Sequence, residues 1–166
     1  MKNTLLVIAV FIAIAMLFGA STVEETKPPA YVGDNAKNCK MCHKDQFAAW
    51  ETWKMAKAYE SLPAEDKAKP ECIGCHVTGA GVEGGFVDAT KTPQFLNVQC
   101  EACHGPAGDH AKNPMKVKPA GDPKASCVNC HNEKYAGFKK DEWKLDEAIK
   151  SIKHWKDKEA AKEAGA

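Results

Sequence analysis

The segment CKMCHKDQFAAWETWKMAKAYESL, residues 39–62, begins with two cysteines and a histidine and continues with a helical pattern of apolar residues. The same C-x-x-C-H order recurs in CIGCH (72–76), CEACH (100–104) and CVNCH (127–131). All eight cysteines of the chain lie in these four motifs, and a histidine directly follows each pair. The fold must therefore accommodate four copies of one short pattern.

C-x-x-C-H is the attachment sequence of c-type haem. Its two thiols reach the vinyl groups of one porphyrin, and the adjacent histidine binds the iron from one face. Disulfides, zinc ribbons or a thioredoxin-like site also use paired cysteines, but none requires a histidine after every pair. The sequence therefore predicts four covalently bound haem c groups, attached through Cys39, Cys42, Cys72, Cys75, Cys100, Cys103, Cys127 and Cys130, with His43, His76, His104 and His131 as iron ligands.

The N-terminus has the pattern of an export signal. Lys2 precedes an apolar run from Leu5 to Phe18, and small residues follow at positions 19–21. This pattern predicts a signal peptide over residues 1–21, cleaved near Ala20 or Ser21, and a mature domain over residues 22–166. The alternative is an uncleaved membrane anchor, through which alone we expect membrane contact. We expect a periplasmic protein, with an extracellular or membrane-associated location as alternatives.

The composition indicates one domain with a small side-chain core. The chain has 166 residues, of which 44% are hydrophobic. Residues 79–85 and 104–126 are rich in glycine or proline and are typical of loops. We therefore expect the haems to fill much of the interior. Because 23 basic residues balance 22 acidic ones and the charges are interspersed, no nucleic-acid binding is expected.

Two histidines, His110 and His154, remain for the sixth iron position. His110 follows the CHGP turn and is either a solvated loop residue or a distal ligand. His154 lies in a predicted amphipathic helix over residues 143–164, pointing away from its apolar stripe, and is either solvated or a ligand. At most two haems can therefore have two histidines from this chain, and the others take another ligand, borrow one from a neighbouring chain or stay open.

Met55 lies on the apolar face of a helix predicted from Asp45 to Leu62. A methionine in this position commonly fills a core. If Met55 binds iron, twelve residues of helix would place it about 18 Å from His43, so that it could serve only a different haem. Met115 lies in a loop rich in lysine and proline and is expected to be structural or exposed.

The sequence resembles the tetrahaem cytochrome c-554 family. The resemblance is carried by residues 31–62, by CIGCHVTGAGVEGGF (72–86), CEACHGPAGDH (100–110) and CVNCH (127–131), and by WKLDEAIK (143–150). It implies a mainly α fold in which helices and long loops wrap around four closely packed haems. It also implies that His110 lies opposite His43, that His154 lies opposite His131, and that the haem of His76 is five-coordinate. The family has a histidine where this chain has Met55, which implies that Met55 lies opposite His104.

These observations favour an electron carrier with redox protein partners over an enzyme. The alternatives are a reductase of a small molecule, such as nitric oxide, at a five-coordinate haem, and a subunit of a filament with haem-to-haem contacts. A Met55 ligand would give one haem a higher potential than its bis-histidine neighbours.

Overall fold

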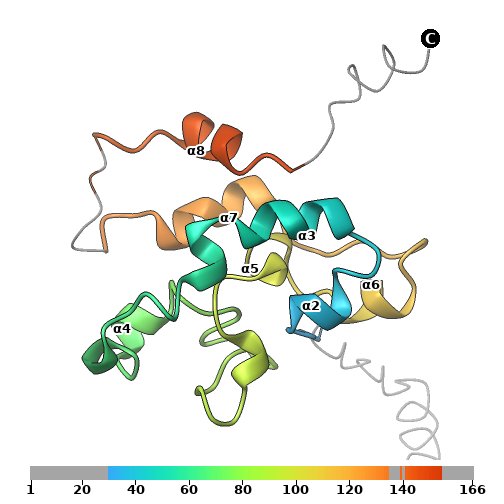
Figure 1. The fold of residues 1–166 in the computed structure, drawn as a ribbon, viewed down its shortest axis with the longest axis horizontal. Helices are drawn as coiled ribbons and strands as arrows, with labels where there is room; N and C mark the ends of the chain where they lie inside the picture. The colour runs from blue at the N-terminus through green and yellow to red at the C-terminus, as the bar shows by residue number, and fades with distance from the viewer. Residues whose placement is uncertain (1–29, 135–138, 140, 155–166) are drawn as a thin grey trace, which may run out of the picture.

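The computed structural model describes residues 30–134, 139 and 141–154. It is mainly helical, as predicted, and the only β pairing in the described part is an isolated bridge between Val77 and Leu96. Short helices alternate with long loops (Figure 1). The α-helices are α2 (Asn35–Asn38), α3 (Lys44–Glu51), α4 (Pro70–Ile73), α5 (Cys100–His104), α6 (Gly108–Lys112), α7 (Pro123–Cys130) and α8 (Leu145–Ser151), and the 3-10 helices are η1 (Lys54–Lys57), η2 (Ala64–Asp66) and η3 (Pro93–Phe95).

Local sequence signals explain where several of these helices begin. The Asp122 carboxylate accepts hydrogen bonds from the backbone N–H groups of Lys124 and Ala125, and Pro123 occupies the first position of α7. Pro70 occupies the same position in α4. A capping carboxylate and a proline satisfy or remove N–H groups that the helix itself leaves unpaired. These signals place Cys127 and Cys130 on one helix and Cys72 on another.

The predicted continuous helix from Asp45 to Leu62 is wrong, because α3 ends at Glu51. The Thr52 hydroxyl donates to the carbonyl of Ala49 at 2.6 Å, and Trp53 is extended before η1 begins at Lys54. Tertiary bonds fix this break, since Trp50 Nε1 donates to the Val98 carbonyl at 2.9 Å and Val98 N–H donates to the Met55 carbonyl at 3.1 Å. The estimate of about 18 Å, which assumed an unbroken helix, therefore no longer applies.

The side-chain core is small, as the composition suggested. Among the described residues, the buried hydrophobic side chains are Phe47, Ala58, Val77, Phe86, Phe95 and Ala107. Val77, Phe86 and Phe95 form one cluster, against which Tyr31, Tyr59, Ile73, Ala80 and Leu96 pack. Because Ile73 lies in CIGCH (72–76), this cluster packs directly against the second cysteine motif.

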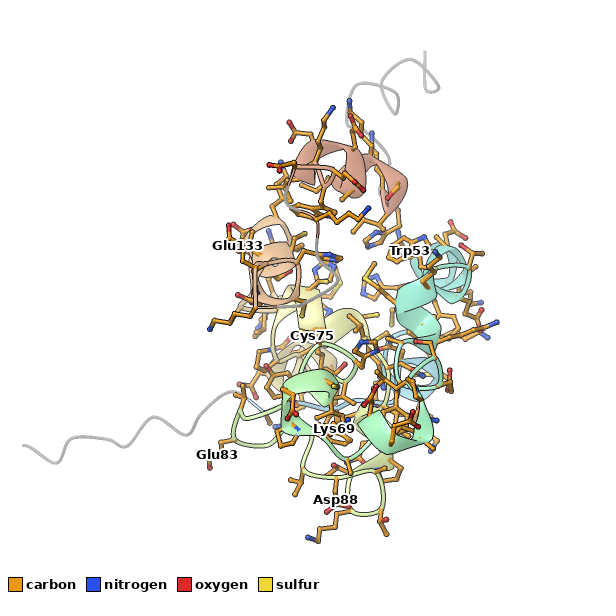
Figure 2. The ribbon with its side chains drawn as sticks, turned by 90° about the vertical axis from the view of Figure 1, so that its left-hand side faces the viewer. Trp53, Lys69, Cys75, Glu83, Asp88 and Glu133 are labelled. Carbon is orange, nitrogen blue, oxygen red and sulfur yellow. The ribbon has the colours of Figure 1, made fainter. Side chains whose placement is uncertain are left out.

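The helices are spread between two ends of the molecule, and α5 lies between these ends (Figure 1). In both views α8 lies at one extremity of the molecule, beyond α3 and α7 (Figures 1 and 2). Trp53 and Glu133 lie toward this end, Cys75 lies near the middle, and Lys69, Glu83 and Asp88 lie toward the opposite end (Figure 2). Contacts between α5 and α7 connect the third motif to the fourth.

Two sequence predictions fall outside the described residues. The proposed signal peptide, residues 1–21, lies before residue 30, and the last ten residues of the helix predicted over 143–164 lie beyond residue 154. Within the described part of that helix, α8 ends at Ser151. None of the helices that the structure describes has the length and apolar character needed to cross a membrane.

Candidate haem sites

The four cysteine motifs meet in space, although 27 to 33 residues separate successive ones along the chain. The thiol of Cys39 in the first motif is hydrogen bonded to that of Cys100 in the third. The thiol of Cys130 in the fourth is hydrogen bonded to that of Cys75 in the second. Cys103 in the third motif lies close enough to Cys127 in the fourth for an electrostatic interaction that adds to burial in raising the pKa of Cys103. The motifs thus follow one another in space in the order first, third, fourth, second.

These contacts and the burial of the thiols also change their acidity. The hydrogen bond with Cys100 lowers the pKa of Cys39 and raises that of Cys100. Burial raises the pKa of Cys103, and burial together with the nearby Cys75 raises the pKa of Cys130 to about 12. Because their pKa values are raised above the ordinary thiol value, Cys103 and Cys130 are neutral at pH 7. All eight cysteines carry free thiols in the structure.

His43 and His110 lie together, as the resemblance implied. Their ring centroids are 6.0 Å apart and the rings are inclined by 30°. His110 lies on α6, and its Nδ1 is 2.6 Å from the Val117 carbonyl. When Nδ1 donates to a carbonyl, Nε2 is left as the nitrogen that can bind a metal. Two imidazoles that bind opposite faces of one iron have centroids roughly 6 Å apart, because each metal–nitrogen bond is about 2 Å.

His76 is held by a similar backbone contact. Its Nδ1 lies 2.6 Å from the carbonyl of Ala58, the buried residue that follows η1. This contact again leaves Nε2 as the metal-binding nitrogen. The segment that follows the first motif therefore also holds the histidine of the second motif in place.

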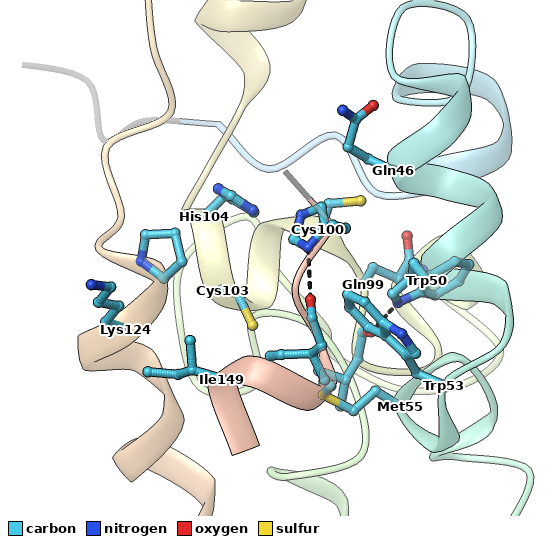
Figure 3. Close-up of a pocket in the computed structure, with 14 residues that line it drawn as sticks. Gln46, Trp50, Trp53, Met55, Gln99, Cys100, Cys103, His104, Lys124 and Ile149 are labelled. Atoms are coloured by element: carbon cyan, nitrogen blue, oxygen red, sulfur yellow. Dashed lines mark hydrogen bonds between the residues drawn. The ribbon is translucent and has the colours of Figure 1, made fainter. Parts of the chain in front are cut away.

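His104 faces a cavity that also contains His154 and Met55. The cavity opens to solvent on one side, and its volume is about 640 Å³ when that open space is included. Its lining includes Cys100, Cys103, Trp53, Ile149 and Ile152 (Figure 3). The rings of His104 and His154 are 6.0 Å apart and nearly perpendicular, at 86°. The Trp53 ring contacts His154 edge to face at 5.3 Å. Burial, followed by the neighbouring His154 and His43, lowers the pKa of His104 and favours its neutral, metal-binding form.

The placement of His154 differs from the sequence predictions. The helical pattern predicted that its side chain points away from the apolar stripe, but α8 ends at Ser151 and His154 follows the helix. It is half-buried and lies beside His104, whereas the resemblance implied a place opposite His131. Met55 is half-buried and lines the cavity of His104, the location that the resemblance implied. Its binding to iron stays a prediction.

His131 directly follows the last residue of α7. Its ring stacks on Trp143, with centroids 5.0 Å apart and planes inclined by 10°. Trp143 belongs to the segment that leads into α8. The fourth motif is therefore tied to the C-terminal part of the chain through this stacked pair.

Two buried polar residues that the sequence analysis missed hold the first and third motifs together. Glu101, 2% exposed, accepts hydrogen bonds from the backbone N–H groups of Val32, Gly33 and Ala107. The Asn35 side-chain oxygen contacts the Cys39 thiol and the Cys100 N–H, and its buried Nδ2 has no partner in the structure. A buried amide or carboxylate requires such partners. Glu101 occupies a variable position of C-x-x-C-H, so the motif gives no signal of its role.

The residues present fit c-type haem. Each motif supplies two free thiols and a histidine, and Nδ1 of His76 lies within hydrogen-bonding distance of a carbonyl. The cavity beside His104 is lined by both thiols and the histidine of the third motif, the three groups that c-type haem attachment requires. The unpartnered Asn35 Nδ2 between the first and third motifs is a donor that a carboxylate of the cofactor could satisfy.

Comparisons with known proteins match the same segments. A family model described as "Cytochrome c554 and c-prime" matches residues 38–105, and a model for a doubled CXXCH motif matches residues 93–136. Cytochrome c-554 of Nitrosomonas europaea is 36% identical over 108 residues, which cover 53% of this chain and 46% of that protein. The multihaem cytochrome MtrA of Shewanella baltica is 32% identical over 82 residues, which cover 40% of this chain and 24% of that protein.

A solved structure has a similar fold. The reduced state of cytochrome c554 from Nitrosomonas europaea matches with a TM-score of 0.53 and 28% sequence identity, over 74% of this chain and 83% of that chain. In sequence, this chain spans less than half the length of the two curated relatives.

Proposed function

We propose that the chain is an exported carrier of electrons with four haem c groups. The family match, the relatives and the fold all support a multihaem c-type cytochrome of the cytochrome c-554 family. When bound, haem supplies one-electron redox chemistry at its iron. The observation that carries this proposal is the contact between thiols of different motifs. Attachment points this close together favour electron exchange along the row of motifs.

The chain's own residues have distinct tasks in this proposal. The eight cysteines attach the cofactors, and the histidine of each motif holds one face of each iron. His110 is the second ligand opposite His43, supported by the ring separation of 6.0 Å. Apolar side chains such as Ile149, Ile152 and Trp53 line the cavity of His104 and exclude water from part of the row of motifs.

Export and location belong to the same proposal. Covalent haem attachment agrees with the signal peptide proposed for residues 1–21, and together they favour a periplasmic location. We propose redox proteins as the donor and acceptor. Neither is identified by the surface, on which several of the described lysines pair with acidic residues three positions away, as Lys37 does with Asp34 and Lys91 with Asp88.

The test is a haem count combined with a redox titration of the full chain, produced with c-type haem maturation. We expect four haems per chain, removal of the signal near residue 21, and reversible one-electron steps. Fewer than four haems would contradict the cofactor assignment. Sustained turnover of nitric oxide at the haem of His76 would contradict a carrier role and favour the reductase.

Replacing His110 tests the first axial pair. His110→Ala should convert one low-spin haem to high spin, because the iron opposite His43 loses its second imidazole. Lys112→Ala, on the same helix and exposed, is the control. Electron paramagnetic resonance of the oxidised protein reports the change, and an unchanged spectrum would remove His110 from the ligand set.

A further inference from the structure

The cavity of His104 contains two candidates for one iron position. His154 presents an imidazole and Met55 a thioether, and both line the cavity together with Cys100 and Cys103. The resemblance places Met55 there and sends His154 to another haem. The structure instead brings His154 to His104, so the two side chains compete for one role.

The geometry of the histidine pair favours His154. The two centroids are 6.0 Å apart, the same separation as in the pair of His43 and His110. It also agrees with the roughly 6 Å expected for two imidazoles on opposite faces of one iron. Nδ1 of His154 lies 2.9 Å from the Ile152 carbonyl, a contact that leaves Nε2 as the nitrogen that can bind a metal.

The surroundings of His154 also favour this role. Ile149 and Ile152 at the C-terminal end of α8 line the cavity, so the apolar side of the helix carries His154 to His104. Trp53 packs edge to face against the His154 ring at 5.3 Å and restricts its rotation. Two elements far apart in sequence therefore hold this imidazole in place.

Met55 is fixed beside the same pair. Its carbonyl accepts hydrogen bonds from Val98 at 3.1 Å and from Ala58 at 3.3 Å, so its backbone is tied to the segment that leads into Cys100. Figure 3 shows its side chain next to Trp53 at the edge of the cavity. Methionine is unbranched and flexible, and its sulfur can reach a new position without movement of the backbone.

We propose that His154 is the sixth ligand of the haem attached through Cys100, Cys103 and His104, and that Met55 is a reserve ligand that binds this iron when His154 is absent. This inference rests on the proposed four-haem carrier. In it, His43 and His110 bind one iron, and His104 and His154 bind another. Of the six histidines, the chain then has no further one to offer to the haems of His76 and His131.

The test compares three variants of the full-length holoprotein. With Met55→Leu we expect both bis-histidine signals to persist in electron paramagnetic resonance and near-infrared magnetic circular dichroism. With His154→Ala we expect loss of one bis-histidine signal and appearance of a histidine–methionine signal. In the double variant that haem should become high-spin. Met115→Leu is the matched control, because Met115 is 93% exposed.

Each result has a defined meaning. Loss of a low-spin haem in Met55→Leu alone, or two intact bis-histidine signals in His154→Ala, would overturn the assignment of His154. A high-spin haem in His154→Ala alone would overturn the reserve role of Met55. If His154→Ala fails to fold, His154→Leu provides the same test, because leucine fills space but offers no ligand, so one bis-histidine signal should again become histidine–methionine. The haem count is measured first, because fewer than four haems in the wild-type protein would contradict the proposed carrier instead.

Discussion

At the scale of single residues, Glu101 is a buried carboxylate within the third haem motif, with 2% of its surface exposed. Its carboxylate oxygens accept from Val32 at 3.0 and 3.1 Å, from Gly33 at 2.7 Å and from Ala107 at 2.7 Å. Ala107 directly precedes α6, which carries His110. One carboxylate between the cysteines of the third motif therefore positions the ligand proposed for the first.

Glu101→Gln should lower the free energy of unfolding by about 1–3 kcal/mol, because an amide has one acceptor oxygen and its NH₂ group would face a backbone donor. Urea denaturation of the holoprotein measures the loss. Glu65→Gln, at an exposed position, is the control and should leave stability nearly unchanged. Equal effects of the two substitutions would show that the backbone bonds to Glu101 contribute little.

Tyr31 gives the protein a predictable response to alkaline pH. Burial, and then the negative charge of Glu101, raise the pKa of Tyr31 in the folded protein. The folded state therefore holds the phenolic proton more tightly than the unfolded chain, whose tyrosines titrate near pH 10. This contribution to stability is present below that pH and is lost as pH rises through the higher, folded pKa.

Tyr31→Phe should flatten this alkaline loss of stability, because phenylalanine keeps the edge-to-face contact with Phe95 but has no proton to lose. The measurement is the difference between the urea midpoints of the variant and the wild type, followed from about pH 8 to about pH 12. Lysines titrate in both proteins and cancel in the difference. A constant difference across this range would contradict the prediction.

At the scale of elements, the sequence marks where some helices begin through capping residues and prolines. It does not mark where α3 ends, because that end is set by tertiary hydrogen bonds. Asp122 and Pro123 mark the start of α7 in the sequence. The end of α3 has no glycine or proline. It depends on Val98, more than 40 residues away in sequence, which accepts a hydrogen bond from Trp50 and donates one to the Met55 carbonyl. Because α8 also ends early, the position of His154 could not be obtained from helical periodicity.

The CHGP turn depends on two glycines whose backbones touch. Gly105 has a φ of +77°, and a Cβ there would lie 2.6 Å from the Gly121 nitrogen. The Gly121 N–H donates to the His104 carbonyl at 2.7 Å. This close approach connects the end of α5 to the residues that lead into α7, and it fixes the direction in which the chain leaves His104.

Gly105→Ala should cost more stability than Gly81→Ala. Gly81 has a similar φ of +73°, but a Cβ there would meet no atom within 4 Å, so it isolates the backbone strain of roughly 1 kcal/mol. Gly105→Ala adds a collision with backbone atoms, which a rotamer change cannot relieve. Denaturation of the two holoproteins gives the comparison, and equal losses would show that the contact with Gly121 yields without cost.

At the scale of the whole molecule, the sequence was sufficient for the four motifs, the mainly helical fold and the small core, because each depends on residue type and spacing. It was insufficient for the spatial order of the motifs. Cys39 meets Cys100 and Cys75 meets Cys130 across long stretches of sequence, and α5 packs against α7 between them. The third motif is therefore internal to the row and the second is terminal.

This order predicts unequal effects when one haem is removed. Cys100→Ala with Cys103→Ala should interrupt the row between the first motif and the fourth, whereas Cys72→Ala with Cys75→Ala should leave the other three contiguous. Pulse reduction followed by absorbance should then show slower internal electron exchange only in the first variant, provided that both retain three haems. The contrast depends on spatial order alone, since both variants lose one attachment pair of the same type. Equal slowing would mean that electrons follow the order of the motifs in the sequence, where removal of either middle motif interrupts the row.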